Sequence, residues 1–166
     1  MSDVTNTGPH PRVYGVAIRR GEALLVRASK PHDGEEMWWL PGGGIDFGES
    51  PATALRREFI EETGLEVLSE LLIDVLDDTR TRPNGQLVHS LRVIYMVVVD
   101  DGEPQAEADG TTDHVEWVPM TKVLERRLAP YAEQALSTAL QILNGSSGHH
   151  THRVDAIETL RNYAGL

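Results

Sequence analysis

The sequence predicts an α+β protein in which a mixed β-sheet lies between helices, as in an α/β/α sandwich. Three observations support this prediction. Runs of β-favouring residues fill the first half of the chain, one strongly marked helix interrupts them, and helical patterns follow the last of these runs. Strands, one helix, strands and then helices is an order that fits a sheet covered on both faces.

Length and composition favour a single domain. The chain has 166 residues, of which 40% are hydrophobic and 25% are charged, and these values are ordinary for a globular protein. We expect residues 1–11 to form a mobile arm, residues 12–143 to form the domain, and residues 144–166 to form a linker and a C-terminal helix.

The predicted strands begin with a hairpin, Arg12 to Arg20 and Glu22 to Ala28, which turns at Gly21. A short strand from Met37 to Pro41 leads into three consecutive glycines. Further strands are expected in three later segments: one or two between Leu65 and Thr81, a central strand from Leu87 to Asp100, and a short one from His114 to Val118.

Three helices are expected near the C-terminus. Thr121 is a candidate cap for a short helix from Lys122 to Leu128, and Pro130 begins one that reaches about Leu143. The apolar residues that should face the core in this second helix are Ala132, Ala135, Leu136, Ala139, Leu140 and Leu143. A last amphipathic helix from His152 to Ala164 could dock on its own domain or on a partner subunit.

The helix with the strongest local signals runs from Pro51 to Thr63. Ser50 supplies a side-chain cap, Pro51 suits the first helical position, and Gly64 suits the left-handed residue that ends a helix. Ala52, Leu55 and Phe59 should pack inward, while three carboxylates, those of Glu58, Glu61 and Glu62, share a neighbouring stripe.

This acidic stripe is unfavourable for the helix by itself. Like charges three and four residues apart destabilise a helix, and Glu61 and Glu62 also lie near its electronegative end. Clustered carboxylate oxygens are the ligands that Mg²⁺ and Mn²⁺ prefer, so a metal site is one interpretation. A solvated acidic face is the other.

The segment from Gly43 to Leu65 resembles the Nudix box, a pattern of one glycine, spaced acids, an Arg-Glu pair and a Glu-Glu pair. Each fixed position is filled, by Gly43, Glu49, Arg57, Glu58, Phe59, Glu61, Glu62, Gly64 and Leu65. The resemblance implies the Nudix fold and the hydrolysis of a nucleoside diphosphate linked to another group, or of a nucleoside triphosphate, with Mg²⁺ or Mn²⁺ as cofactor.

The resemblance also implies roles for individual residues. Glu58, Glu61 and Glu62 are the expected metal ligands, and the carbonyl of Gly43 could join them. Arg57 should pair with Glu49 or Glu58 and so orient the ligands. The general base could be Glu58, or it could come from outside the box, where the candidates are Asp113, His114 and Glu116.

Residues that bind the rest of the substrate are less clearly marked. Arg27, Arg80 and Arg82 could line a cleft, although each could equally be a solvated charge; Lys30 and Arg92 are similar candidates. Trp38 and Trp39 are adjacent, so on a strand they point to opposite faces. We expect Trp38 to contact the substrate, with packing of both rings in the core as the alternative.

Charge and hydropathy exclude several classes of function. A net charge of −11 argues against binding to duplex nucleic acid, and no apolar run is long enough to cross a membrane. The absence of cysteine excludes disulfides and thiol catalysis. We expect a cytoplasmic enzyme, for which a homodimer is a candidate assembly. The alternatives are a nucleotide-sensing domain without turnover and an isomerase on the same fold.

Overall fold

The computed structural model describes residues 8–29, 35–82, 84–106, 112–145 and 151–165. Within these ranges the strands are β1 (His10–Arg19), β2 (Glu22–Ala28), β3 (Trp38–Trp39), β4 (Gly42–Gly44), β5 (Val67–Thr81), β6 (Leu87–Val99) and β7 (Thr112–Pro119). The helices are α1 (Pro51–Thr63), α2 (Met120–Val123), α3 (Pro130–Leu143) and α4 (Thr151–Ala164).

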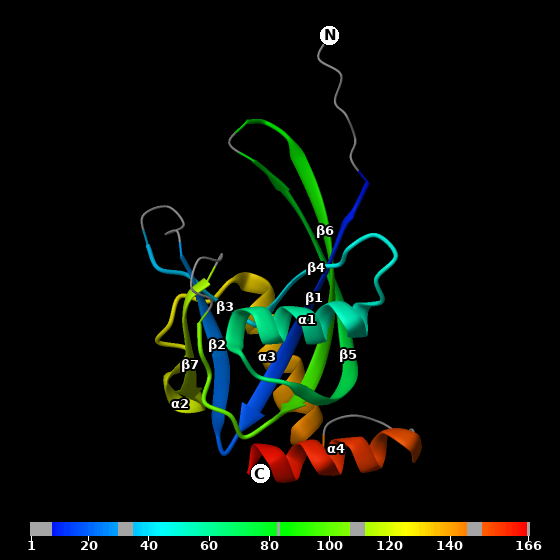
Figure 1. Cartoon of the computed structure of the whole chain (residues 1–166), viewed down its shortest axis with the longest axis vertical. Helices are drawn as coiled ribbons and strands as arrows, with labels where there is room; N and C mark the ends of the chain where they lie inside the picture. Colours follow the sequence, from blue (N-terminus) through cyan, green and yellow to red (C-terminus); the bar gives the residue numbers. More distant parts are fainter. Residues whose placement is uncertain (1–7, 30–34, 83, 107–111, 146–150, 166) are drawn as a thin grey trace.

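The described strands form one mixed sheet. Its main path runs β3-β2-β1-β6-β5, with β4 paired to β1 and β7 paired to β2. The pairing of β1 with β6 is parallel, and the other pairings are antiparallel. The mixed sheet with flanking helices, expected from the order of the elements, is therefore confirmed (Figure 1).

Strand β1 separates two apolar clusters, because its side chains alternate between the faces of the sheet. Val13 and Ala17 belong to the cluster that packs under α1. Tyr14, Val16 and Ile18 belong to the cluster that packs under α3. Figure 1 shows α1 crossing in front of the sheet and α3 lying behind it.

Helix α1 has the predicted boundaries and caps. The Ser50 hydroxyl accepts a hydrogen bond from the Thr53 amide at 3.2 Å, and Gly64 ends the helix at φ 69°. Leu55 and Phe59 are buried as expected, but the buried alanine is Ala54, since Ala52 is only half-buried.

Three details differ from the sequence prediction. The glycines Gly42–Gly44, for which no strand was predicted, form strand β4, because β1 offers them backbone partners. Thr121 does not cap a helix, because it lies inside α2. This helix begins at Met120, after Pro119, without a side-chain cap, and it ends at Val123. In α3, Ile142 is buried and Leu140 is only half-buried.

Helix α4 docks on its own domain. Backbone amides of Arg20 and Gly21, at the turn of the first hairpin, donate to the carbonyls of Tyr163 and Ala164 at 3.3 and 2.9 Å. Leu160 is buried in the same cluster as α3. Residues 1–7 of the predicted arm, which was expected to span residues 1–11, and most of the predicted linker, residues 146–150, lie outside the described residues. The last two residues of the predicted arm, His10 and Pro11, belong to β1 instead.

Candidate active site

The three glutamates of α1 differ strongly in exposure. Glu62 is 4% exposed, and its Oε2 accepts a hydrogen bond from the Gly42 amide at 2.9 Å. The Glu58 side chain is 15% exposed and the Glu61 side chain 49% exposed. The helix therefore presents one fixed carboxylate, one partly enclosed carboxylate and one that solvent reaches.

Gly43 lets the Glu58 carboxylate lie directly against β4. A Cβ atom built at Gly43 would lie 2.4 Å from the Glu58 Cδ and Oε1 atoms and 2.5 Å from Oε2. No side chain other than hydrogen fits at this position while Glu58 stays in place. Burial raises the pKa of Glu58, although the hydrogen bond from Arg57 opposes that effect.

Arg57 holds the acids of the loop and of the helix together. Its Nε and Nη2 bind the two carboxylate oxygens of Glu49 at 3.0 and 2.9 Å, a two-pronged arrangement that suits a guanidinium. Its Nη1 donates to Glu58 at 2.8 Å and to Glu61 at 3.3 Å, and Nη2 also donates to the Gly44 carbonyl at 3.0 Å. The sequence left the partner of Arg57 open between Glu49 and Glu58, and Arg57 binds both.

The predicted convergence of three carboxylates is not observed in this arrangement. In the described part of the chain, no three His, Asp or Glu side chains are gathered closely enough to hold a metal ion. The contacts explain this, because Gly42 binds Glu62 while Arg57 draws Glu58 and Glu61 toward itself.

The donors nevertheless fit a hard divalent cation in their chemistry. Carboxylate and carbonyl oxygens are what Mg²⁺ selects. The space at Gly43 places the Glu58 carboxylate beside the backbone of β4, and the Glu61 side chain, which Arg57 contacts at 3.3 Å, is 49% exposed.

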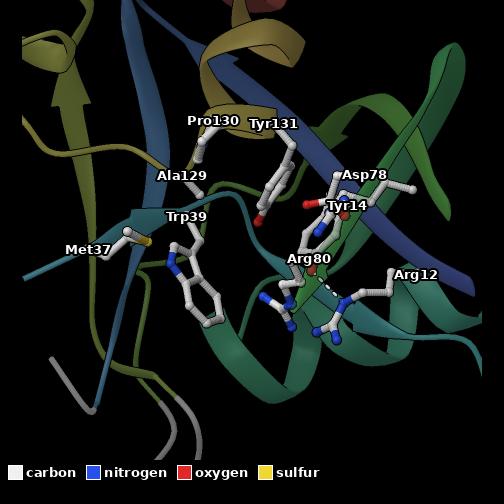
Figure 2. Close-up of a pocket in the computed structure, with 10 residues that line it drawn as sticks. Arg12, Tyr14, Met37, Trp39, Asp78, Arg80, Ala129, Pro130 and Tyr131 are labelled. Carbon is white, nitrogen blue, oxygen red and sulfur yellow. Dashed lines mark hydrogen bonds and ion pairs between the residues drawn. The ribbon is translucent and has the colours of Figure 1, made fainter. Parts of the chain in front are cut away.

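A cavity of about 280 Å³ lies on the α3 side of the sheet. Ten residues line it, from four strands (β1, β3, β5 and β6), the residue before β3 and the start of α3: Arg12, Tyr14, Met37, Trp39, Asp78, Arg80, Arg92, Ala129, Pro130 and Tyr131. Figure 2 shows the Tyr131 hydroxyl pointing into the space between Trp39 and Tyr14, with the side chains of Arg12 and Arg80 reaching the same cavity.

Arg12 connects this cavity to the acids of α1. It pairs in register with Gly44 on β4, one residue from the glycine that Glu58 contacts. Its Nε donates to the Tyr14 hydroxyl at 2.7 Å. Neither Arg12 nor Arg80 makes an ion pair with a carboxylate in the described residues, whereas Arg92 pairs with Asp78 at 2.6 Å.

Of the charged residues predicted to bind substrate, the structure places two in the cavity, Arg80 and Arg92. Lys30 lies outside the described residues. Arg27 lies elsewhere and pairs with Asp113 at 2.8 Å and Glu36 at 3.0 Å, and Arg82 lies near the tip of the β5–β6 hairpin, where it bonds Gln86 at 3.1 Å.

Trp38 and Trp39 do point to opposite sides, but it is Trp39 that lines the cavity. Trp38 is 3% exposed and belongs to the core under α3. The expected contact of Trp38 with substrate is therefore corrected: β2 and the loop before α3 enclose Trp38, as its pairing with Arg27 and its bridge to Leu128 indicate.

The candidate bases outside the box are engaged in pairs. Asp113 accepts from Arg27, and the His114 Nε2 lies 3.1 Å from the Glu116 carboxylate. Glu116 also forms an ion pair with Arg126. These contacts give the three residues a structural explanation that does not involve substrate.

Sequence reasoning missed most of the cavity. Arg12 lies at the start of a predicted strand, Asp78 lies inside a strand, and Tyr131 follows the proline that begins a helix. None of these positions belongs to a recognisable motif. The alternation of Trp38 and Trp39 was the one local signal that pointed to this part of the molecule.

Comparison with known proteins identifies the family. The NUDIX domain model matches residues 8–139, so α4 lies beyond the matched region. A MutT-like protein of Streptomyces ambofaciens is 30% identical over 82% of this chain and 79% of its own length. YjhB of Bacillus subtilis, provisionally named an ADP-ribose pyrophosphatase, is 34% identical over 74% of this chain, which spans only 53% of that relative.

Two further similarities concern function and fold. A Mycobacterium tuberculosis protein, provisionally named 8-oxo-dGTP diphosphatase 2, is 28% identical over 81% of this chain and 91% of its own length. The NUDIX domain of NrtR from Shewanella oneidensis, solved in complex with ADP ribose, superposes with a TM-score of 0.71 at 23% identity over 86% of this chain and 94% of that one. No helix in the described residues is long and apolar enough to cross a membrane. The complete box, the fold and these matches lead to one conclusion: the chain belongs to the NUDIX domain family and is a Nudix hydrolase.

Proposed function

We propose that this protein hydrolyses the diphosphate linkage of a nucleoside diphosphate derivative or a nucleoside triphosphate, with Mg²⁺ or Mn²⁺. The observation that carries the proposal is the position of Arg12. It lines a cavity of nucleoside size and lies one strand from the acids of α1. A substrate with its nucleoside in the cavity would extend its phosphates past Arg12 toward Glu58.

Glu58, Glu61 and Glu62 would hold the metal, together with the carbonyl of Gly43. When bound, a divalent cation neutralises charge on the phosphates and lowers the pKa of the attacking water. Arg57 keeps Glu49 and Glu58 in a fixed relation through its hydrogen bonds. The enclosed Glu58, whose pKa burial raises, is suited to accept a proton from the attacking water.

Arg12 and Arg80 are suited to bind the phosphates. Both guanidiniums reach one cavity without a carboxylate partner in the described residues, in a protein whose net charge is −11. Concentrating positive charge locally is how an acidic enzyme attracts an anionic substrate. The cavity volume of about 280 Å³ limits the enclosed part of the substrate to one nucleoside-sized group.

The test is a screen of nucleoside triphosphates, nucleotide sugars, dinucleoside polyphosphates and ADP-ribose with and without Mg²⁺, with the products identified. We expect Mg²⁺-dependent cleavage of at least one class into phosphorylated products. The Glu62→Gln variant should lose activity by several orders of magnitude while keeping its circular dichroism spectrum. A well-folded Glu62→Gln protein with wild-type activity would exclude the assigned role of α1.

A further inference from the structure

The polar groups that line the cavity are almost all hydrogen-bond donors. Arg12, Arg80 and Arg92 present N–H groups only. The one carboxylate in the lining, that of Asp78, already accepts from Arg92 at 2.6 Å. A ligand that enters this cavity therefore meets many donors and few acceptors.

Three donors of lining residues are buried without a hydrogen bond in the described part of the chain. The Nε of Arg92 and the hydroxyl of Tyr131 have no hydrogen-bond partner of ordinary distance and angle in the described residues, and the third is the indole Nε1 of Trp39. Arg92 is only 5% exposed. Buried donors without a partner cost free energy, and a ligand that supplies acceptors recovers it.

The Tyr131 hydroxyl can donate a hydrogen bond to a ligand. Burial raises the pKa of Tyr131 well above its ordinary value, so the group keeps its hydrogen at neutral pH. Figure 2 shows its oxygen directed between Trp39 and Tyr14. The indole nitrogen of Trp39 is turned toward Met37 instead, so Trp39 contributes its ring face.

The walls of the cavity are flat and apolar enough for a planar ring. Tyr14 and Tyr131 contact each other with ring centroids 4.4 Å apart, and Trp39 lies across the cavity from them. Met37 and Pro130 complete the apolar lining. Aromatic faces combined with a few directed polar groups are typical of sites for heterocyclic ligands.

We infer that the cavity selects nucleobases whose edge carries an oxo group over those that carry an amino group at the same position. The inference rests on the proposed function, because it assumes that the nucleoside enters this cavity. Guanine and thymine present carbonyl acceptors where adenine and cytosine present an amino donor. A carbonyl here would accept from both Arg92 and Tyr131, whereas an amino group would leave the Nε of Arg92, which can only donate, without an acceptor.

The test compares pairs of bases that differ at this position and in the hydrogen on the adjacent ring nitrogen. Binding of IMP and AMP to the full chain is measured by tryptophan fluorescence, and hydrolysis is compared for ITP against ATP, UTP against CTP, and inosine diphosphate ribose against ADP-ribose. We expect the oxo member of each pair to be favoured by about tenfold or more, the effect of leaving one buried donor unpaired.

The Tyr131→Phe variant identifies the donor. It should narrow the oxo preference several-fold without loss of stability, because the hydroxyl it removes has no partner in the described residues. Tyr95→Phe is the matched control. Tyr95 lies on β6 but packs in the cluster under α1, outside the cavity. The oxo preference of Tyr95→Phe should therefore equal that of the wild type.

The outcomes separate the two proposals. Three results would overturn the inference while leaving hydrolysis intact. They are equal rates or equal affinities within every pair, a preference for amino bases, and a stronger preference for oxo bases in Tyr131→Phe than in the wild type. Absence of hydrolysis for all substrates would instead remove the proposed function, and the IMP and AMP affinities would still decide the preference of the cavity. Failure of both monophosphates to bind, with no preference in hydrolysis, would also reject the inference.

Discussion

Replacing Gly43 with alanine should separate the chemistry of the site from the stability of the fold. An ideal Cβ at this position would lie 2.4 Å from Glu58, whereas ordinary contacts of Cβ atoms begin at 3.4 Å, so the carboxylate has to retreat by 1.0 Å. The contacted atoms are the end of a flexible side chain, and the retreat therefore costs little folding free energy. A displacement of about 1 Å in catalytic geometry can lower a rate by about 10²-fold.

The adjacent Gly44 supplies the control. A Cβ at Gly44 would meet no atom within 4 Å, and Gly44 belongs to the same strand. The assay measures kcat on the best substrate of the screen together with the melting temperature. We expect Gly43→Ala to lose about 10²-fold in kcat with a small change in melting temperature, and Gly44→Ala to match the wild type. Equal kcat for the two variants would refute the proposed dependence of catalysis on the position of Glu58.

Further predictions test the cavity, the acid network and the C-terminal helix. Arg80→Gln should raise KM at least several-fold, while Arg82→Gln, just beyond the end of β5 and outside the cavity, should not. Equal KM values for the two variants would remove Arg80 from the site. Hydrogen bonds from Arg57 lower the pKa of Glu49 below its ordinary value of 4.5, so the ionised carboxylate stabilises the fold above that pH, and this stabilisation is lost as pH falls through the lower folded pKa. The melting temperature of Glu49→Gln should therefore fall less steeply than that of the wild type between about pH 6 and pH 3, where carboxylates titrate. An equal slope for the two proteins would contradict this linkage. Leu160→Ala should lower the free energy of unfolding by about 2–4 kcal/mol in urea melts, because the Leu160 side chain of α4 is buried. Glu158 is exposed on the same helix, so Glu158→Ala should change this free energy by less than about 0.5 kcal/mol.

Local chemistry explains why α1 could be predicted to the residue. Ser50, Pro51 and Gly64 act on the backbone groups next to them, so their effect does not depend on the rest of the fold. The spacing of Glu58, Glu61 and Glu62 places them on one stripe of the helix for the same reason. The hairpin at Gly21 and the strands on either side of it were predictable on similar local grounds.

Contacts between distant segments decided which partners these groups have. The sequence did not determine whether Arg57 binds Glu49 or Glu58, and in the fold its guanidinium binds both. No strand was predicted for the glycines after Pro41, but pairing with β1 makes them one. Each result depends on the register between segments many residues apart, which local propensity does not encode.

By itself, the sequence determined the fold class, the motif helix and the family, because repeated apolar spacing, helix caps and the box are all properties of neighbouring residues. Only the tertiary structure decided which side chains form the cavity. Arg12, Trp39, Arg80, Arg92 and Tyr131 come from four strands and one helix, and they meet because the pairing of β1 with β4 and β6 sets their positions. Strand alternation predicts that Trp38 and Trp39 face opposite ways, but only packing against the loop before α3 determines that Trp38 is enclosed and Trp39 faces the cavity.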